Sequence, residues 1–175
     1  MSKNIKLRAF ELFDVSALHH WLNDEESISM VGRTPMTKEE TENYVLHLRK
    51  ENALIMAIEN QEKELVGWVH LSNVSHGHGR AEIGLLLAPE FRGHGYGKEA
   101  MEEMIKMGFH QLRLHKIYLT TRAINERAIG LYKKLGFQVE GTLRQHSFIN
   151  GTYYDTIFMG LLASEWNQIR NKIEN

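Results

Sequence analysis

The segment Arg92-Gly93-His94-Gly95-Tyr96-Gly97-Lys98 joins a predicted strand directly to a predicted helix. Its three alternate glycines allow the backbone to come close to a ligand and to turn its N–H groups inward. The first turn of the helix that follows adds the positive end of a helix dipole. Together these features predict an anion site that is suited to a pyrophosphate.

A strand precedes this loop, and a helix and a second strand follow it. Residues 81–87 form an apolar strand that stops before Pro89. Apolar residues then recur at helical spacing over residues 100–112, and residues 115–120 again have the composition of a strand. This order predicts two parallel strands joined by a right-handed crossover.

Further strands are expected on both sides of this unit. The apolar patterns predict them at residues 5–9, 53–58, 65–71, 137–147 and 153–161. A polar turn at residues 60–63 and the dipeptide Asn150-Gly151 are typical of hairpin connections. The result is a mixed α/β sheet with antiparallel strands at both ends of the chain.

Three further helices are marked by their ends. Asp14 is a candidate N-cap for a short helix, and Thr37 with Glu40 forms a capping box for a helix that ends near residue 50. Asn125 is the candidate cap of a last helix, which stops at Gly136. The chain has neither a linker nor a repeat, so its 175 residues are expected to form one domain, 1–175.

Two well-known nucleotide-binding motifs differ from the glycine-rich loop. A Walker A loop requires glycine where this chain has Arg92, and serine or threonine where it has Glu99. A Rossmann fingerprint requires its third glycine at Lys98. Nucleotide binding through this loop is therefore kept only as the last of three hypotheses for the function of the chain.

Two signatures in the expected order resemble those of the GNAT family of N-acetyltransferases. The spacing Arg-x-x-Gly-x-Gly at residues 92–97, after Leu-Leu-Ala-Pro, resembles its acyl-CoA loop, and residues 125–137 resemble its second signature. Residues 150–155 and 161–166 are similar to the subgroup that contains ribosomal-protein N-terminal and spermidine acetyltransferases. The resemblance covers about residues 66–166. It implies a GNAT fold: a mixed, mostly antiparallel sheet of about seven strands, splayed at the centre, with about four helices on its faces.

The resemblance implies acetyl-CoA as co-substrate. The pyrophosphate of this donor would lie on the amides of residues 92–98. The pantetheine arm would pair like an added strand with the backbone at Leu85, Leu86 and Leu87, which explains why these side chains can be apolar. The expected donor site therefore consists largely of backbone groups.

The candidate catalytic residues are Tyr132 and Glu82. Asn125, Ala128 and Tyr132 share one helix face. The resemblance assigns all three to the donor site and makes Tyr132 the general acid for the leaving thiolate. Glu82 interrupts an apolar strand and is the candidate general base for the amine. Simpler interpretations stay open: a core aromatic for Tyr132, a helix cap for Asn125, and a solvent-facing residue at a strand edge for Glu82.

Composition excludes several function classes. The chain has no cysteine, so disulfides, thiolate metal sites and an acyl-cysteine intermediate are excluded. A net charge of −1 argues against nucleic-acid binding. There are ten histidines, but His76 and His78 have no third ligand at usable spacing, so no metal site is expected.

The sequence shows no secretory signal and no apolar membrane-spanning stretch, and we expect a cytoplasmic protein without a membrane partner.

The acceptor is expected to be an amine of a small molecule or of a peptide N-terminus. Glu25, Glu26 and Tyr153 are weaker acceptor-side candidates, and Arg33 argues against a polyamine and suits an acceptor with a carboxylate or phosphate. The alternatives are a polyamine acetyltransferase and, from another class, a non-catalytic CoA-binding regulatory module. A homodimer is expected from exposed strand edges and from the resemblance.

Overall fold

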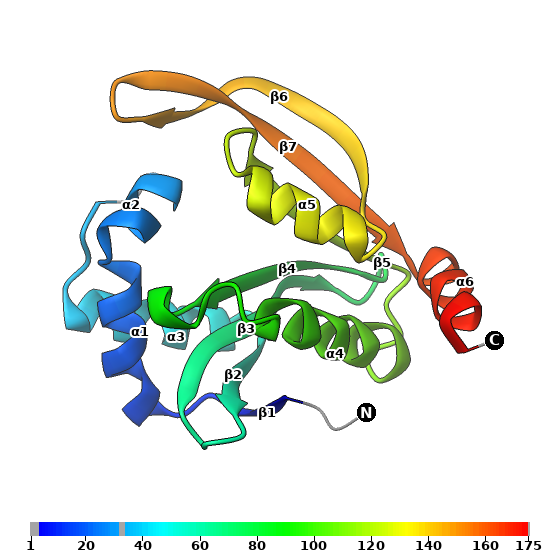
Figure 1. The fold of residues 1–175 in the computed structure, drawn as a ribbon, viewed down its shortest axis with the longest axis horizontal. Coiled ribbons are helices and arrows are strands. Elements are labelled where there is room, and N and C mark those ends of the chain that lie inside the picture. Colours follow the sequence, from blue (N-terminus) through cyan, green and yellow to red (C-terminus); the bar gives the residue numbers. More distant parts are fainter. Residues whose placement is uncertain (1–3, 32–33, 175) are drawn as a thin grey trace.

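The computed structural model describes residues 4–31 and 34–174, and its centre is one seven-stranded sheet (Figure 1). The strand order is β1-β2-β3-β4-β5-β7-β6. The strands are β1 (Ile5–Ala9), β2 (Leu54–Asn60), β3 (Leu65–Ser75), β4 (Arg80–Leu87), β5 (Lys116–Arg122), β6 (Gln138–Ile149) and β7 (Thr152–Leu162). All seven predicted strands are confirmed, and β3 and β6 are longer than predicted.

One pair of neighbouring strands, β4 and β5, is parallel, and this pair is short. Residues 80–82 of β4 pair with residues 116–118 of β5, while β4 pairs with β3 over almost its whole length. After Glu82, β4 and β5 diverge, and β5 continues along β7 as far as Arg122. The sheet therefore splays at its centre, as the family resemblance implies.

The helices cover both faces of the sheet (Figure 1). They are α1 (Val15–Leu22), α2 (Glu25–Val31), α3 (Lys38–Lys50), α4 (Tyr96–His110), α5 (Glu126–Lys134) and α6 (Ala163–Glu174), with short 3-10 turns at Leu12–Asp14 and Pro89–Phe91. Side chains of α1 and α3 pack around Trp68 on one face, and those of α4 pack around Leu71 and Ile83 on the other.

The described residues form six α-helices rather than about four, and α2 and α6 are the two that were not predicted. Asp24 caps α2, because its Oδ2 accepts hydrogen bonds from the Ser27 amide at 3.0 Å and from Ser27 Oγ at 3.2 Å. Arg92 adds tertiary contacts to Glu26 and Ser27. Helix α6 follows β7 without a turn, and Trp166 anchors it in the α4-side core. The cap at Asp24 and the acidic first turn after it are a local helix signal that the sequence prediction missed.

Local signals at the helix ends were mostly correct. Thr37 and Glu40 form the predicted capping box, Asn125 caps α5, and Gly136 has the left-handed φ of 96°. Asp14 is a correction, because its side chain does not cap α1. Its buried carboxylate instead accepts hydrogen bonds from Arg8 at 2.7 and 2.9 Å and from the Glu11 amide at 2.8 Å. Among the described residues, no helix is both long and apolar enough to cross a membrane.

Candidate active site

The glycine-rich loop turns its backbone at two glycines and then enters α4. Gly93 and Gly95 have φ values of 92° and 86°, a region that L residues rarely adopt, and Gly95 is the N-cap of α4. The helix begins at Tyr96, inside the predicted loop. Its first N–H groups have no acceptor one turn earlier within the helix. The structure therefore provides the geometry that the predicted pyrophosphate site needs.

Gly97 allows α4 to pack directly on the end of β4. A Cβ at this position would lie 3.1 Å from Leu85 Cδ2 and 3.3 Å from Leu87 Cδ1, closer than ordinary contacts. It would also lie 3.9 Å from Leu131 Cδ2 of α5. The glycine-rich loop, the apolar end of β4 and helix α5 therefore meet at this glycine.

The side chain of Arg92 points away from the loop and toward α2. Its two terminal nitrogens donate to Glu26 Oε2 at 2.5 Å and to Ser27 Oγ at 2.9 Å, and Asp24 Oδ2 lies 3.8 Å away. Its Nε donates to the Leu87 carbonyl at 3.3 Å. The Arg92 amide donates to the Pro89 carbonyl at 3.3 Å, and its guanidinium ties α2 to the end of β4.

The exposed part of the loop contains His94 and Lys98. The His94 ring stacks on Tyr96 with centroids 5.7 Å apart, and Lys98 lies 3.7 Å from Glu102 on α4. Sequence reasoning missed Arg127 on α5, whose Nη2 lies 3.7 Å from the position of a Cβ on Gly93. Arg127 is therefore a further cation beside the predicted pyrophosphate site.

The edge of β4 that faces β5 has no strand pairing after Glu82 in the described part of the chain. Leu85, Leu86 and Leu87 lie on this segment and are half-buried. Leu85 and Leu87 pack with the α4 core, and Leu86 packs with the α1 and α3 core. The free edge leaves backbone groups available for an extended ligand, as the pantetheine prediction requires.

Glu82 lies where the two halves of the sheet separate. It is half-buried on the internal strand β4, so the alternative of a strand-edge position does not hold. Its Oε2 accepts a hydrogen bond from Asn73 Nδ2 at 2.7 Å. Its register partner on β5 is Tyr118, whose pKa is raised mainly by burial and further by the charge of Glu82. A carboxylate is thus present at the apex of the splay.

Tyr132 lies on α5 and contributes to the α4-side core. Its ring centroid is 6.0 Å from that of Phe137, and burial raises the pKa of its phenol to about 12. A thiol titrates near 8.5, so full proton transfer to a thiolate would be unfavourable by roughly 5 kcal/mol. The phenol therefore stays protonated and is better suited to donate a hydrogen bond to a developing thiolate than to give up its proton.

Asn125 has its side-chain oxygen committed to the helix. Oδ1 accepts a hydrogen bond from the Ala128 amide at 3.1 Å, which confirms the cap. This bond fixes the first turn of α5, from which Tyr132 projects one to two turns later. Any contact of Asn125 with a pantetheine arm would therefore use its amide nitrogen.

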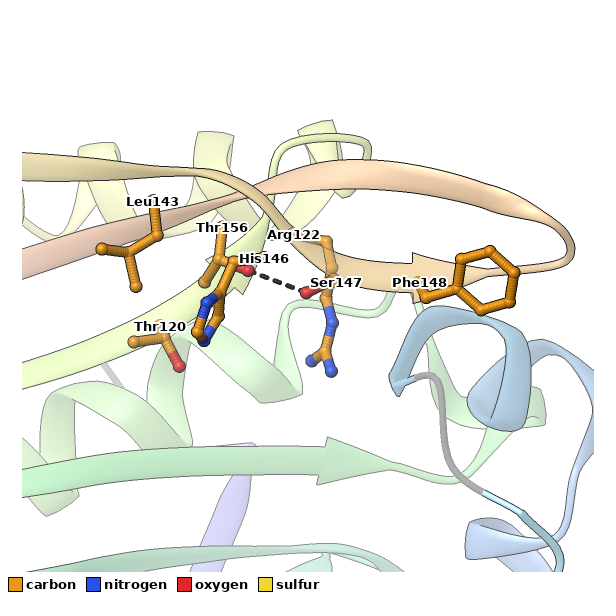
Figure 2. A pocket seen from close by; sticks show the side chains of 7 residues that line it. All are labelled: Thr120, Arg122, Leu143, His146, Ser147, Phe148 and Thr156. Atoms are coloured by element: carbon orange, nitrogen blue, oxygen red, sulfur yellow. Dashed lines mark hydrogen bonds between the residues drawn. The ribbon is translucent and has the colours of Figure 1, made fainter.

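An open groove lies on the face of β5, β6 and β7 that looks across the splay toward β4 (Figure 2). Its volume is about 490 Å³. The residues that line it are Thr120, Arg122, Leu143, His146, Ser147, Phe148 and Thr156. Sequence reasoning missed Thr120 and Arg122 and gave His146 no role, although Tyr118, Thr120 and Arg122 follow the two-residue period of one strand face.

The weaker acceptor-side candidates lie near one end of this groove. Glu25 is exposed on α2, Glu26 is paired with Arg92, and Tyr153 is 62% exposed near the hairpin tip, with its ring 4.8 Å from that of Phe148. Arg33 lies outside the described residues.

The two turn histidines do not form part of the site. His76 and His78 are exposed. No group of three or more histidine, aspartate or glutamate residues that could hold a metal occurs within residues 4–31 and 34–174.

Comparison with known families settles the relationship. The acetyltransferase (GNAT) domain family matches residues 4–138 of the chain. The chain belongs to the GNAT family. The match spans the glycine-rich loop, the splayed strands and α5, and it identifies this GNAT protein as an N-acetyltransferase that uses acetyl-CoA.

Similar proteins include two with an assigned substrate. Spermidine N(1)-acetyltransferase of Vibrio cholerae is 32% identical over 168 residues, which are 95% of this chain and 97% of the relative. The Escherichia coli K12 enzyme of the same name is 32% identical over 165 residues, 93% and 88% of the two chains. A crystal structure of the Vibrio cholerae enzyme with CoA and spermine superposes on this GNAT protein with a TM-score of 0.88 over 95% of this chain and 99% of that one.

Proposed function

We propose that this GNAT enzyme transfers the acetyl group of acetyl-CoA to the primary amine of a small molecule or of a peptide N-terminus. The observation that carries this proposal is the divergence of β4 from β5 directly after Glu82. Along the chain, Glu82 is followed by the unpaired edge of residues 83–87 and then by the glycine-rich loop, and α5 lies beside them. Since the chain has no cysteine, the amine attacks directly in a ternary complex.

The donor side fits acetyl-CoA on the observations at the loop. The amides of residues 93–97, with the turns at Gly93 and Gly95, would hold the pyrophosphate, and Arg127 adds a positive charge. The amides at the two ends of the expected range, Arg92 and Lys98, instead donate to the Pro89 and Gly95 carbonyls. The edge at residues 83–87 would pair with the pantetheine arm. The amine nitrogen forms the new C–N bond to the acetyl carbon and the C–S bond of the thioester breaks. Tyr132 donates a hydrogen bond to the departing thiolate, and the proton that the nitrogen loses after its attack converts this thiolate to the free thiol of CoA.

The acceptor must lose a proton before it can attack. An alkylamine has a pKa near 10.4 and is mostly protonated at neutral pH. Glu82, at the apex of the splay, accepts that proton directly or through a water. The half-buried position of Glu82 supports this role, because water competes less with the amine for a half-buried carboxylate than for an exposed one.

A polyamine is the second candidate acceptor. The Vibrio cholerae and Escherichia coli relatives are named spermidine N(1)-acetyltransferases, and the similar Vibrio cholerae structure contains spermine. Glu25 is exposed on α2 beside the groove and would attract a cation. Its neighbour Glu26 is already paired with Arg92.

We also propose that the enzyme self-associates through β6. This strand is the outer edge of the sheet, and most of its residues are exposed. Val139 on β6 is 50% exposed. A long edge strand that also exposes Val139, Leu143 and Phe148 is a ready surface for a second copy. A similar Vibrio cholerae structure, with a TM-score of 0.81 and 30% identity, is described as dodecameric.

A thiol-release assay with acetyl-CoA tests the reaction. The acceptor panel should contain polyamines, amino acids, amino sugars, aminoglycosides and short peptides. We expect CoA release that depends on at least one amine, together with the N-acetylated product by mass spectrometry. Acetyl-CoA binding without transfer to any amine would favour a regulatory module, and tighter binding of ATP than of CoA would favour a nucleotide-binding protein.

A further inference from the structure

We propose that the acceptor amine carries a carboxylate or a phosphate, and that Arg122 binds this anionic group in the groove, with His146 beside it. The inference rests on the proposed function, because it names the substrate class of the same site. Both side chains point into the groove from different strands, Arg122 from β5 and His146 from β6 (Figure 2). The groove is thus built to present positive charge opposite β4.

The β5 strand places Arg122 on the same wall as the candidate base. Side chains two residues apart on a strand share a face, so Tyr118, Thr120 and Arg122 follow one another along it. Tyr118 is the register partner of Glu82, and the two strands separate there. Arg122 lies four positions after Tyr118 on β5, so their Cα atoms are roughly 13 Å apart. One acceptor can therefore place its amine toward the apex and its anionic group toward Arg122.

An irregularity in β6 adds His146 to the groove. Leu143 pairs with Thr156 and Ser147 pairs with Tyr154, so three residues of β6 lie opposite the single residue Asp155. Bulges of this kind redirect side chains and are frequent beside active sites. The Ser147 and Thr156 hydroxyls lie 2.8 Å apart across the two strands and fix the register next to His146.

The charges of the groove disfavour a polycation. None of the seven lining residues is acidic. Of the three acidic residues at the start of α2, Glu26 and Asp24 face the guanidinium of Arg92 at 2.5 and 3.8 Å, and Glu25 is exposed. A polyamine would bring several positive charges next to Arg122. A carboxylate or phosphate instead matches the planar donor fork of arginine.

Isothermal titration with CoA present tests this inference without turnover. The probes are ω-amino acids of increasing length against the matching alkylamines, phosphoethanolamine against ethanolamine, and spermidine. We expect an anionic amine to bind at least about tenfold more tightly than its neutral partner, the size of a charge-assisted hydrogen bond. The amino-acid and phosphoethanolamine pairs distinguish a carboxylate from a phosphate.

Three variants locate the effect. Arg122→Gln should abolish the preference, and Arg122→Lys should restore part of it because the charge is kept. The matched control is Arg144→Gln, which changes an exposed arginine of β6 that does not line the groove. A spermidine affinity above that of every anionic amine, or an unchanged preference in Arg122→Gln, would overturn the inference. A thiol-release assay on the same proteins tests the acetyl-transfer proposal separately. The titration measures amine binding whether or not acetyl transfer occurs, so failure of one proposal can be distinguished from failure of the other.

Discussion

Tyr132 combines a motif position with an environment that keeps its proton. Burial raises its pKa to about 12, so the role we propose for it is a hydrogen bond that strengthens as negative charge develops on sulfur. We expect Tyr132→Phe to lower kcat about a hundredfold, the usual cost of losing one such donor. Acetyl-CoA binding should persist, because the phosphate loop and the β4 edge are untouched. Thiol release and titration calorimetry measure the two quantities.

The matched control for that substitution is Tyr44→Phe. Tyr44 lies edge-on to Trp68, with centroids 6.0 Å apart, in the core on the opposite face of the sheet. The substitution removes a phenol hydroxyl on the face of the sheet opposite to the core that contains Tyr132. Equal kcat values for Tyr132→Phe and wild type would remove the phenol from the mechanism.

The raised pKa of Tyr132 also predicts a pH dependence of stability. The phenol ionises near pH 10 in the unfolded chain and near pH 12 in the folded protein, so the folded state binds more protons between these values. Stability is therefore full below pH 10 and falls as the pH rises. At pH 11 this one group removes about 1.4 kcal/mol from the free energy of unfolding.

Urea unfolding at pH 9 and pH 11 measures this loss. The comparison is between wild type and Tyr132→Phe, so that the titration of lysines cancels. We expect wild type to lose more stability than the variant over this interval. The same loss in both proteins would contradict the burial of the phenol.

At the scale of elements, local pattern was sufficient wherever the chain repeats a period or carries a cap. The alternation in β1, the capping box of α3 and the αL stop at Gly136 were all legible in the sequence. Helix α2 was missed although Asp24 caps it and its first turn is acidic, because it spans only seven residues and its tertiary anchor, Arg92, is more than sixty residues away in the chain. Contacts over such a distance have no periodic signal.

Arg92 should accordingly control the order of α2. Its guanidinium holds Glu26 and Ser27, and its Nε holds the last carbonyl of β4. We expect Arg92→Gln to raise the exchange rate of the α2 amides about tenfold, since one charge-assisted contact is lost. Hydrogen exchange at Ile28, whose amide donates to the Asp24 carbonyl at 2.8 Å, is the direct measurement.

Lys106→Gln is the control, because Lys106 is exposed on α4 and the substitution removes the same type of charge elsewhere. Its α2 exchange should equal that of wild type. If Arg92→Gln left α2 exchange unchanged as well, the helix would owe its order to other contacts.

At the scale of the whole molecule, the sequence indicated the donor side better than the acceptor side. The donor side is largely one continuous segment, residues 85–98, plus one helix, so its motifs are contiguous. The groove joins β5 to β6 and β7, and the bulge between Leu143 and Ser147 shifts which residues of β6 face it. A two-residue period counted along β6 is broken at that bulge, which is why His146 had no readable role.

The proposed self-association uses the same outer strand, β6. A twelve-residue edge strand presents unpaired backbone groups, and Val139 near its start adds apolar surface that is 50% exposed. We expect sedimentation velocity to detect species larger than the 20.3 kDa monomer, in proportions that rise with protein concentration. Val139→Lys should shift the distribution toward monomer, because association would bury an unpaired charge. Leu12→Lys, at a position that is 51% exposed on the first 3-10 turn, should leave the distribution unchanged. A purely monomeric wild type, or an equal shift in both variants, would place the contact surface elsewhere than β6.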